Sequence, residues 1–557
     1  MVKKTGGQLL AEALVHERID TVFAIPGIQL DWAMEALRQH SDRIRLFVPR
    51  HEQTTTYMAD GYARVTGRPG VAMVVPGPGV LNASAGLATA YAANSPVIMI
   101  SGHIHLHGIG AGYGMLHEIS NQTTLLGCLT KWNRNVTRVE DIPGAVAEAV
   151  SRAVAGRPRP TAIEISHTLL ESSIEVPDGV TPVAPTHVEA GADLDTAGLE
   201  TVAALIDAAR FPVLYVGGGV LAANATAELQ ALAERARIPV VMSDNGRGAL
   251  SDRHPLAFST LGGRALFEHA DLAVVVGSRF MDAMTPTCSW TVPGLKFAFI
   301  NIDAADMGAP RESEVSVRAD ARAALGWLAE RVAARTVLSD DQAARVKAWA
   351  QEQIDRISPQ IDFLRAIRTA LPEDGIFVNE LTQVGYLARV AFPVYAPRTY
   401  IAPGYQGTLG YGFPAALGAA VGAGGSRVVC ITGDGGFGWN LQELATARKY
   451  GLPVTLIVFN DGYFGNVRAI QKRLFGENVA VDLENPDFMT LAKAFRVPGV
   501  VAHSAAELGA AVRESLSEAG PVLIEVPVGE MPNPWPLLRL QPMAGNPASA
   551  PPNPLAS

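Results

Sequence analysis

The stretch Arg427–Asn466, RVVCITGDGGFGWNLQELATARKYGLPVTLIVFNDGYFGN, indicates the fold class of the chain. It contains two short apolar runs, residues 428–432 and 454–459, whose β-branched content is typical of buried strands. Between them, residues 441–450 have helical spacing, and the Gly-Leu-Pro at 451–453 ends the helix. Two strands joined by a helix make a right-handed crossover, so they lie parallel. The stretch therefore predicts an α/β fold with a parallel sheet.

Two aspartates come directly after these strands. Asp434 lies in the glycine-rich turn 433–436, and Asp461 follows the second strand. We expect them side by side at the carboxyl ends of parallel strands, where open α/β sheets bind ligands. Two hard oxygen ligands beside a glycine-rich helix entry suit Mg²⁺ carrying a diphosphate, whose other oxygens bind backbone N–H groups. The alternative is an ordinary turn in which Asp434 caps the helix.

The spacing of this stretch resembles the thiamine diphosphate signature, which is a GDG triplet, about two dozen residues and then an Asn pair. Here 24 residues, 436–459, separate the triplet from Asn460. The chain departs from the usual pattern at Asp461, where a second Asn is common, but both residues offer a side-chain oxygen. The resemblance implies that Asp434, Asp461 and the backbone carbonyl of Tyr463 ligate Mg²⁺.

A second motif lies near the N-terminus. Residues 44–48 are typical of a strand, and a helical run follows through Ala63, so Glu52 is expected in the first helical turn. RHEQ followed by ADGYAR resembles the pyrimidine-binding domain of the same superfamily. That match assigns Glu52 the catalytic carboxyl that bonds the pyrimidine ring of the cofactor. The alternative is a glutamate favoured only by the helix dipole.

A third motif is the segment 404–414, GYQGTLGYGFP, whose glycines allow the backbone to approach a ligand closely. In related enzymes a bulky apolar side chain beneath the cofactor bends it. Leu409 holds that position, unless it belongs to the core of an ordinary strand-to-helix connection. The resemblance as a whole implies these cofactor-binding residues: Gly407, Leu409, Gly433, Gly435, Gly436, Phe437 and Tyr463.

Length and composition bound the remaining possibilities. At 557 residues the chain is too long for one core and suggests three domains. A net charge of −9 without a basic cluster argues against nucleic-acid binding. No apolar run approaches the roughly 18 residues of a membrane span. The cysteines show neither metal nor disulfide spacing, and the opening residues are an amphipathic helix rather than a signal peptide, so we expect a cytoplasmic protein. The cysteines are Cys128, Cys288 and Cys430.

Strand and helix signals divide the chain into three doubly wound α/β domains, 1–180, 190–335 and 345–530, followed by a proline-rich tail, 531–557. Their order and content resemble the acetolactate synthase and 2-oxoacid decarboxylase group, with pyrimidine-binding, central and diphosphate-binding domains. In that group the pyrimidine domain of one subunit and the diphosphate domain of another enclose each cofactor. The resemblance therefore implies a homodimer or homotetramer acting on a small-molecule substrate.

The central block has glycine-rich turns at 217–219 and 277–280, each after a predicted strand. Some relatives hold FAD or ADP there. The turns leave FAD or ADP open without supporting either one.

Substrate choice depends on side chains around the reacting carbon of the cofactor. The adjacent His-His pair of pyruvate-decarboxylase-type enzymes is missing. Alignment on Thr130 places His117 at a phenylalanine typical of synthases, and Glu118 where thioester-cleaving relatives carry an acid. Gln29 matches a pocket histidine of benzaldehyde lyase. These three residues are candidate catalytic groups, although each could be structural.

Three classes of function remain open. The first is a decarboxylase or carboligase acting on a small 2-oxoacid. The second is a lyase acting on a 2-hydroxyacyl-CoA or an acyloin. The third is a degenerate cofactor-binding protein, which Glu52 argues against because that carboxyl serves chemistry more than binding. The first is favoured over the second because Arg539 is the lone basic residue in the tail, and a CoA phosphate needs more.

Overall fold

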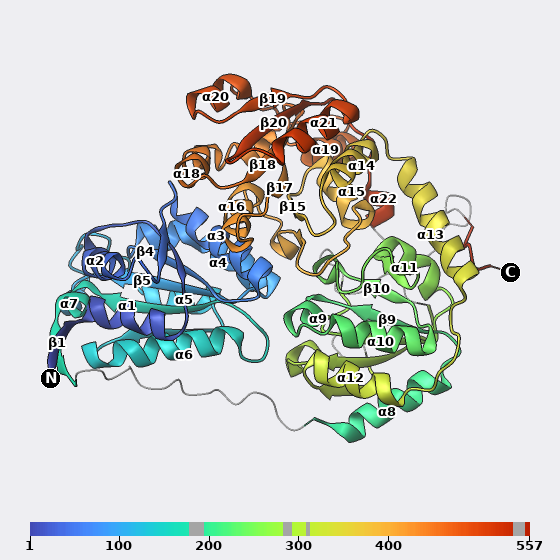
Figure 1. The fold of residues 1–557 in the computed structure, drawn as a ribbon, viewed down its shortest axis with the longest axis horizontal. Coiled ribbons are helices and arrows are strands. Elements are labelled where there is room, and N and C mark those ends of the chain that lie inside the picture. Colours follow the sequence, from blue (N-terminus) through green and yellow to red (C-terminus); the bar gives the residue numbers. More distant parts are fainter. Residues whose placement is uncertain (178–193, 282–291, 308–311, 539–551, 557) are drawn as a thin grey trace.

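The computed structural model describes residues 1–177, 194–281, 292–307, 312–538 and 552–556. Within them the chain forms three α/β domains, each built on a six-stranded parallel sheet with helices packed around it (Figure 1). The predicted fold class is confirmed. The boundary expected between the first two domains, 180–190, lies outside the described residues, as do Cys288 and Arg539.

The N-terminal domain has the strand order β3-β2-β4-β5-β7-β6. Its four inner strands are buried, which explains their largely apolar sequences, whereas the edge strands β3 and β6 are only partly buried. They are β2 (Thr21–Ala24), β3 (Arg45–Phe47), β4 (Gly70–Val74), β5 (Val97–His103), β6 (Trp132–Val136) and β7 (Thr161–Ser166). The helices are α1 (Gly6–His16), α2 (Asp31–Gln39), α3 (Glu52–Thr66), α4 (Pro78–Ala93), α5 (Gln122–Leu129), α6 (Ile142–Val154) and α7 (His167–Glu171). A separate antiparallel pair joins β1 (Val2–Thr5) to β8 (Ser173–Val176).

The C-terminal domain has the order β16-β15-β17-β18-β20-β19. Counted along the chain, both outer sheets run second, first, third, fourth, sixth, fifth, as expected of related folds. The strands are β15 (Ile376–Asn379), β16 (Tyr400–Ile401), β17 (Val428–Gly433), β18 (Val454–Asn460), β19 (Gly499–Val501) and β20 (Val522–Pro527). The helices are α14 (Gln360–Ala370), α15 (Gln383–Ala391), α16 (Gly412–Gly422), α17 (Asp434–Phe437), α18 (Leu444–Tyr450), α19 (Gly465–Phe475), α20 (Phe488–Ala494), α21 (Ala505–Ser515) and α22 (Trp535–Leu538).

The central domain differs in topology, with the order β11-β10-β9-β12-β13-β14. Its chain order reverses between β9 and β12, and such switch points are where doubly wound sheets bind ligands. The strands are β9 (Pro212–Val216), β10 (Val240–Met242), β11 (Ala257–Ser259), β12 (Leu272–Val276), β13 (Lys296–Asn301) and β14 (Val315–Arg318). The helices are α8 (Thr196–Ala208), α9 (Gly218–Ala222), α10 (Thr226–Ala236), α11 (Thr260–Phe267) and α12 (Ala321–Arg331), and α13 (Asp340–Asp355) leads to the C-terminal domain.

The two outer domains of the chain meet through α3 and α16, which lie side by side at the centre of the molecule (Figure 1). Glycine makes this close approach possible. A Cβ at Gly61 would lie 2.0 Å from the carbonyl oxygen of Ala415, and one at Gly418 would lie 1.9 Å from that of Met58. The helix that begins with Glu52 is therefore packed directly against the C-terminal domain.

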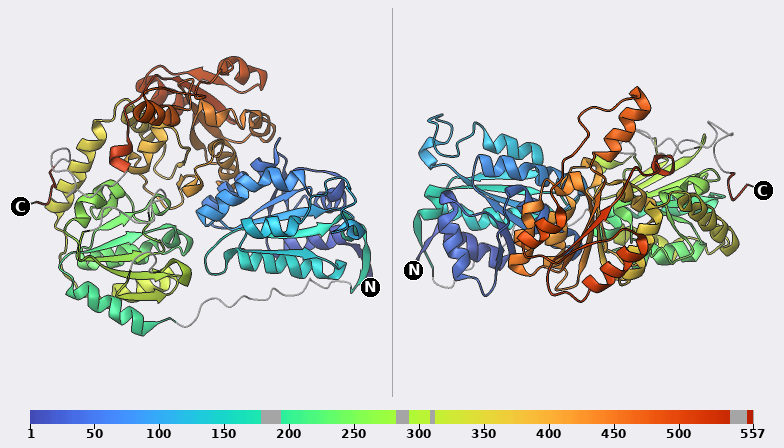
Figure 2. Two further views of the ribbon diagram at one scale, coloured as in Figure 1. Left: turned by 180° about the vertical axis from the view of Figure 1, so that it is seen from behind. Right: turned by 90° about the horizontal axis from the view of Figure 1, so that it is seen from above.

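The three domains lie around a common centre, with the central domain beside the two outer ones, as the view from behind also shows (Figure 2). A cavity of about 1820 Å³ opens between the three domains. Its lining includes the glycine-rich turns 217–219 and 277–279, which follow the strands of the switch point. The cavity has room for a nucleotide, but its geometry, like the sequence, favours neither FAD nor ADP.

Candidate active site

The two aspartates of the diphosphate motif meet at one edge of the C-terminal sheet. Strands β17 and β18 pair in parallel, and an aspartate follows each of them. Asp434 Oδ2 accepts hydrogen bonds from Gly462 N (2.9 Å) and Asn485 Nδ2 (2.6 Å). Helix α17 has Gly433 as its N-cap and no side-chain cap, so the capping alternative for Asp434 is wrong. The Asp434 side chain instead connects its own turn to the loop of Asp461.

The environment of both carboxylates suits a cation. Burial raises the pKa of Asp434, even though its hydrogen bonds oppose the shift. Burial, and then the negative charge of Asp434, raise the pKa of Asp461 to about 6. Among the described residues no group of three or more His, Cys, Asp or Glu side chains gathers as a metal site. Two protein carboxylates would thus need further oxygen ligands, which a diphosphate supplies.

The loop after Asp461 is held in place by a second layer of contacts. Phe464 N donates to Val481 O, and Leu483 N donates to Gly462 O, both at 2.8 Å. Asn485 Nδ2 also bonds Asn460 Oδ1. This places Tyr463 inside a fixed turn. Sequence reasoning missed Asn485, because nothing in the local pattern NPDF connects it with the metal motif.

The glycines of the motif allow close packing beneath it. A Cβ at Gly436 would lie 2.4 Å from Glu380 Oε1. Glu380 is buried, and its carboxylate accepts from the backbone N–H groups of Gly410 (2.7 Å) and Gly412 (3.0 Å). Burial raises the pKa of Glu380. This carboxylate, also missed from the sequence, connects the diphosphate turn to the loop of Leu409.

Phe437 and Leu409, both predicted to bind the cofactor, differ in the solvent exposure of their side chains. The Phe437 side chain is buried in the core, so only its backbone faces the motif. Leu409, in contrast, is 39% exposed, and the alternative that places it in the core is wrong. Gly407 is exposed nearby, with a left-handed backbone (φ +56°). An apolar side chain held outside the core is available to contact a cofactor.

Glu52 is the first residue of α3 in the N-terminal domain. The adjacent His51 caps the helix, because its side chain accepts from Gln53 N. The half-buried Glu52 carboxylate accepts from Asn82 Nδ2 on α4 at 3.0 Å.

Gln29 and His117 lie together in the N-terminal domain. His117 Nδ1 is 3.0 Å from Gln29 Oε1, while Gln29 Nε2 donates to Leu116 O (3.2 Å). Glu118 does not join this pair; its carboxylate accepts from Met115 N within the same turn. The structure thus brings two of the three candidate groups together.

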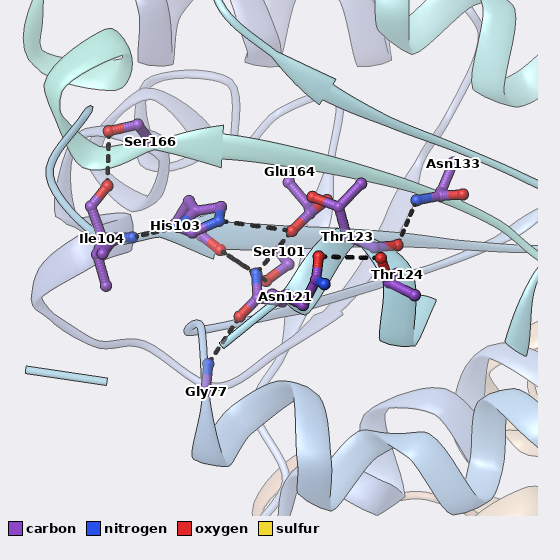
Figure 3. Close-up of polar contacts among 12 residues, drawn as sticks. Gly77, Ser101, His103, Ile104, Asn121, Thr123, Thr124, Asn133, Glu164 and Ser166 are labelled. Carbon is purple, nitrogen blue, oxygen red and sulfur yellow. Dashed lines mark hydrogen bonds and ion pairs between the residues drawn. The ribbon is translucent and has the colours of Figure 1, made fainter. Parts of the chain in front are cut away.

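The turn that carries His117 rests on a buried polar network (Figure 3). Gln122 Oε1 accepts from Gly77 N (2.8 Å), and its Nε2 donates to Glu164 (3.0 Å), beside His103. A Cβ at Gly77 would lie 2.3 Å from His117 O, and Gly77 has φ +58°. Sequence reasoning missed Gln122 and Glu164, whose partners lie far away along the chain.

Helix α19, which follows the metal loop, contacts the start of the C-terminal tail. Trp535 Nε1 donates to Asn466 Oδ1 (2.7 Å), and Glu530 pairs with Arg468 (3.3 Å) and Lys472 (3.4 Å). Asn466 is thus held by the tail, and Arg468 by the residue that precedes it.

Comparison with known families agrees with this geometry. Three models of thiamine pyrophosphate enzymes match the chain: the N-terminal binding domain over residues 4–125, the central domain over 199–328 and the C-terminal binding domain over 382–526. The chain belongs to the thiamine pyrophosphate enzyme family. It is an enzyme that depends on this cofactor. Glu52 lies within the matched N-terminal binding domain, and Asp434 and Asp461 lie within the matched C-terminal one. No helix among the described residues is long and apolar enough to span a membrane.

Curated relatives of this family member match it over nearly its whole length. A probable 2-ketoarginine decarboxylase of Pseudomonas aeruginosa is 34% identical over 94% of both chains. The large subunit of acetolactate synthase isozyme 1 of Escherichia coli is 30% identical, over 94% of this chain and 93% of its own. An acetolactate synthase large subunit of Corynebacterium glutamicum is 31% identical, over 96% of this chain and 88% of its own.

Proposed function

We propose that this enzyme uses Mg²⁺ and thiamine diphosphate to decarboxylate a 2-oxoacid. The remaining fragment is then protonated or joined to a second carbonyl compound. The observation that carries the proposal is the pair of desolvated carboxylates, Asp434 and Asp461, at the carboxyl ends of neighbouring strands. Full-length similarity to a probable decarboxylase and to synthases supports the choice of reaction.

Different residues of the chain are proposed to bind the metal, contact the cofactor and transfer protons. Asp434, Asp461 and the Tyr463 carbonyl would hold Mg²⁺ and, through it, the diphosphate. Leu409 would contact the cofactor, and Glu52 would hold the proton at the pyrimidine ring. When bound, thiamine diphosphate supplies a nucleophilic carbon and an electron sink for the cleaved bond. His117, oriented by Gln29, moves a proton at the product carbon.

The proposed site needs two chains. Within one chain α3, which begins with Glu52, packs against α16, and apolar side chains are exposed near the proposed site residues of both outer domains. Ile28 (57%), Leu81 (51%) and Leu116 (63%) are exposed in the N-terminal domain, and Leu409 and Trp439 (56%) in the C-terminal domain. Exposed apolar surface of this kind is typical of interfaces. We therefore infer at least a two-fold dimer, in which the N-terminal domain of one chain and the C-terminal domain of its partner together form each site.

A substrate panel tests the proposed reaction. The purified enzyme, with cofactor and Mg²⁺, is incubated with pyruvate, longer 2-oxoacids and 2-ketoarginine, while CO₂, aldehydes and acyloins are measured. We expect CO₂ from at least one 2-oxoacid, with the aldehyde or acyloin identifying the fate of the fragment. Cleavage of a 2-hydroxyacyl-CoA without CO₂ release from any 2-oxoacid would instead support the lyase alternative.

A further inference from the structure

A buried carboxylate of the C-terminal domain contacts the chain on both sides of Glu52. Glu443, the last residue of the short 3-10 helix Leu441–Glu443, is fully buried. Its Oε1 accepts from Arg50 N (3.1 Å), His51 N (3.1 Å) and the Thr54 hydroxyl (3.0 Å). Three donors thus converge on one oxygen, and all belong to the first turn of α3 or to the residues that enter it.

These contacts lie at the N-terminus of α3, where the helix has the fewest hydrogen bonds of its own. The first backbone N–H groups of a helix lack partners within it, so their orientation depends on outside acceptors. A carboxylate there is also favoured by the helix dipole. The Thr446 hydroxyl donates to Glu443 Oε2 at 2.5 Å and so fixes the carboxylate from its own domain. Burial raises the pKa of Glu443, while these hydrogen bonds act in the opposite direction.

A second contact runs beside the first. Gln53 Nε2 donates to Asn440 Oδ1 (2.8 Å), and Asn440 Nδ2 donates to Gly410 O (2.5 Å). The segment 440–443 therefore connects the helix of Glu52 with the loop that carries Leu409. Both connected residues belong to the proposed catalytic machinery, whereas Glu443 itself is buried.

We propose that Glu443 is a positioning residue, which fixes the first turn of α3 and thereby the direction of the Glu52 carboxylate. This inference rests on the role of Glu52 in the proposed function. Its physical basis is that a catalytic group displaced by about 1 Å loses on the order of 10²-fold in rate. The diphosphate contacts lie elsewhere, so Glu443 acts on proton transfer and not on cofactor retention.

Three variants test this role. Glu443→Ala removes every acceptor, while Glu443→Gln keeps one oxygen that can replace Oε1. Asp252→Ala is the matched control, because Asp252 also accepts a backbone N–H from another segment, Val394 N (2.7 Å), and pairs with the buried Arg247. The control therefore loses a comparable interdomain carboxylate away from α3.

Two readouts separate positioning from general stability. In the cofactor-free protein, amide hydrogen exchange at Arg50 and His51 should accelerate in Glu443→Ala and remain unchanged in Asp252→Ala. In the cofactor-loaded protein, exchange of the C2 proton of the cofactor should slow on the order of 10²-fold in Glu443→Ala. We expect a loss of only about 3-fold in Glu443→Gln, with cofactor Kd within about 3-fold of wild type in all variants.

The results test the role of Glu443 separately from the proposed function. Wild-type C2 exchange in folded Glu443→Ala would overturn it, as would an equal slowing in Asp252→Ala. If Glu443→Ala does not fold, Glu443→Gln carries the test, and wild-type values for both readouts overturn the proposal. Wild-type C2 exchange in Glu52→Gln would instead show that the proposed function has the wrong catalytic carboxyl.

Discussion

At the scale of single residues, binding and chemistry are assigned to different domains. The diphosphate would be held by the C-terminal domain, whereas Glu52 lies on the N-terminal domain with Asn82 as its polar partner. Glu52→Gln should therefore retain the cofactor with nearly unchanged Kd. Its turnover should fall by on the order of 10²-fold or more, because a positioned proton-transfer group is lost. Calorimetric titration with cofactor and a turnover assay on the same preparation measure both quantities.

The two aspartates should respond differently to substitution. Asp434→Ala removes a proposed metal ligand together with the acceptor for Gly462 N and Asn485 Nδ2, so Mg²⁺-dependent cofactor retention should be lost. Asp461→Asn keeps a side-chain oxygen and should largely preserve retention. Equilibrium dialysis with and without Mg²⁺ distinguishes the variants. Full cofactor affinity in Asp434→Ala would show that the metal lies elsewhere.

The raised pKa of Asp461 predicts a stability effect in the absence of metal and cofactor. Its folded-state pKa, about 6, exceeds the ordinary 3.8, so the unfolded chain releases this proton more readily. The contribution of Asp461 to stability therefore falls as the pH rises from about 4 to 6 and stays low above that window. The cofactor-free Asp461→Asn protein should melt roughly 2 °C higher than wild type at pH 7.5 and no higher at pH 4. Thermal melts at both pH values measure this difference.

At the scale of elements, the turn that begins α4 packs closely against the backbone of His117. Gly77→Ala meets two obstacles, a left-handed φ of +58° and a Cβ only 2.3 Å from His117 O. Gly110→Ala is a matched control, because Gly110 has φ +80° and nothing within 4 Å of its Cβ position. Gly110→Ala should lose about 1 kcal/mol of stability to backbone strain. Gly77→Ala should lose more, because its Cβ must also displace the backbone oxygen of His117. Gly77→Ala alone should also lower kcat, by on the order of 10-fold.

Denaturant unfolding and steady-state kinetics of the two variants provide the comparison. Equal kcat values for Gly77→Ala and Gly110→Ala would remove the support for a catalytic role of the His117 turn. A lower kcat in Gly77→Ala with an unchanged cofactor Kd would show that the effect lies in the chemistry of the N-terminal half-site.

The elements that the sequence predicted well are those whose burial is uniform. Strands β12, β17 and β18 lie within their sheets and are nearly unbroken apolar runs. Strands β6 and β14 carry no such run, because they are sheet edges with mostly half-buried or exposed residues, so hydrophobic and polar residues mix along them. Asp434, Asp461 and Glu52 were predicted because each follows a strand within a motif. Glu380, Glu443 and Asn485 were not, because their partners lie in other elements and leave no local pattern.

At the scale of the whole molecule, the strand orders explain where the sites lie. The two outer domains share one topology and present their site residues on loops that follow the strands, as parallel sheets do. Within one chain they are joined through α3 and α16, an arrangement that places the residues on both sides of Glu52 against Glu443. Completing the site by a second copy of the chain reconciles this packing with the shared-site arrangement of the family.

Mixing two inactive variants tests this assembly directly. In a dimer of Glu52→Gln with Asp434→Ala chains, one site receives both substitutions and the other receives neither. If chains exchange randomly, half of the dimers are mixed and each has one intact site, so about one quarter of wild-type activity should return. Sites formed within a single chain would always carry one substitution, and activity would stay at the level of the separate variants. Turnover measured after dissociation and reassembly of equimolar chains, with each variant treated alone as a control, decides between the two arrangements.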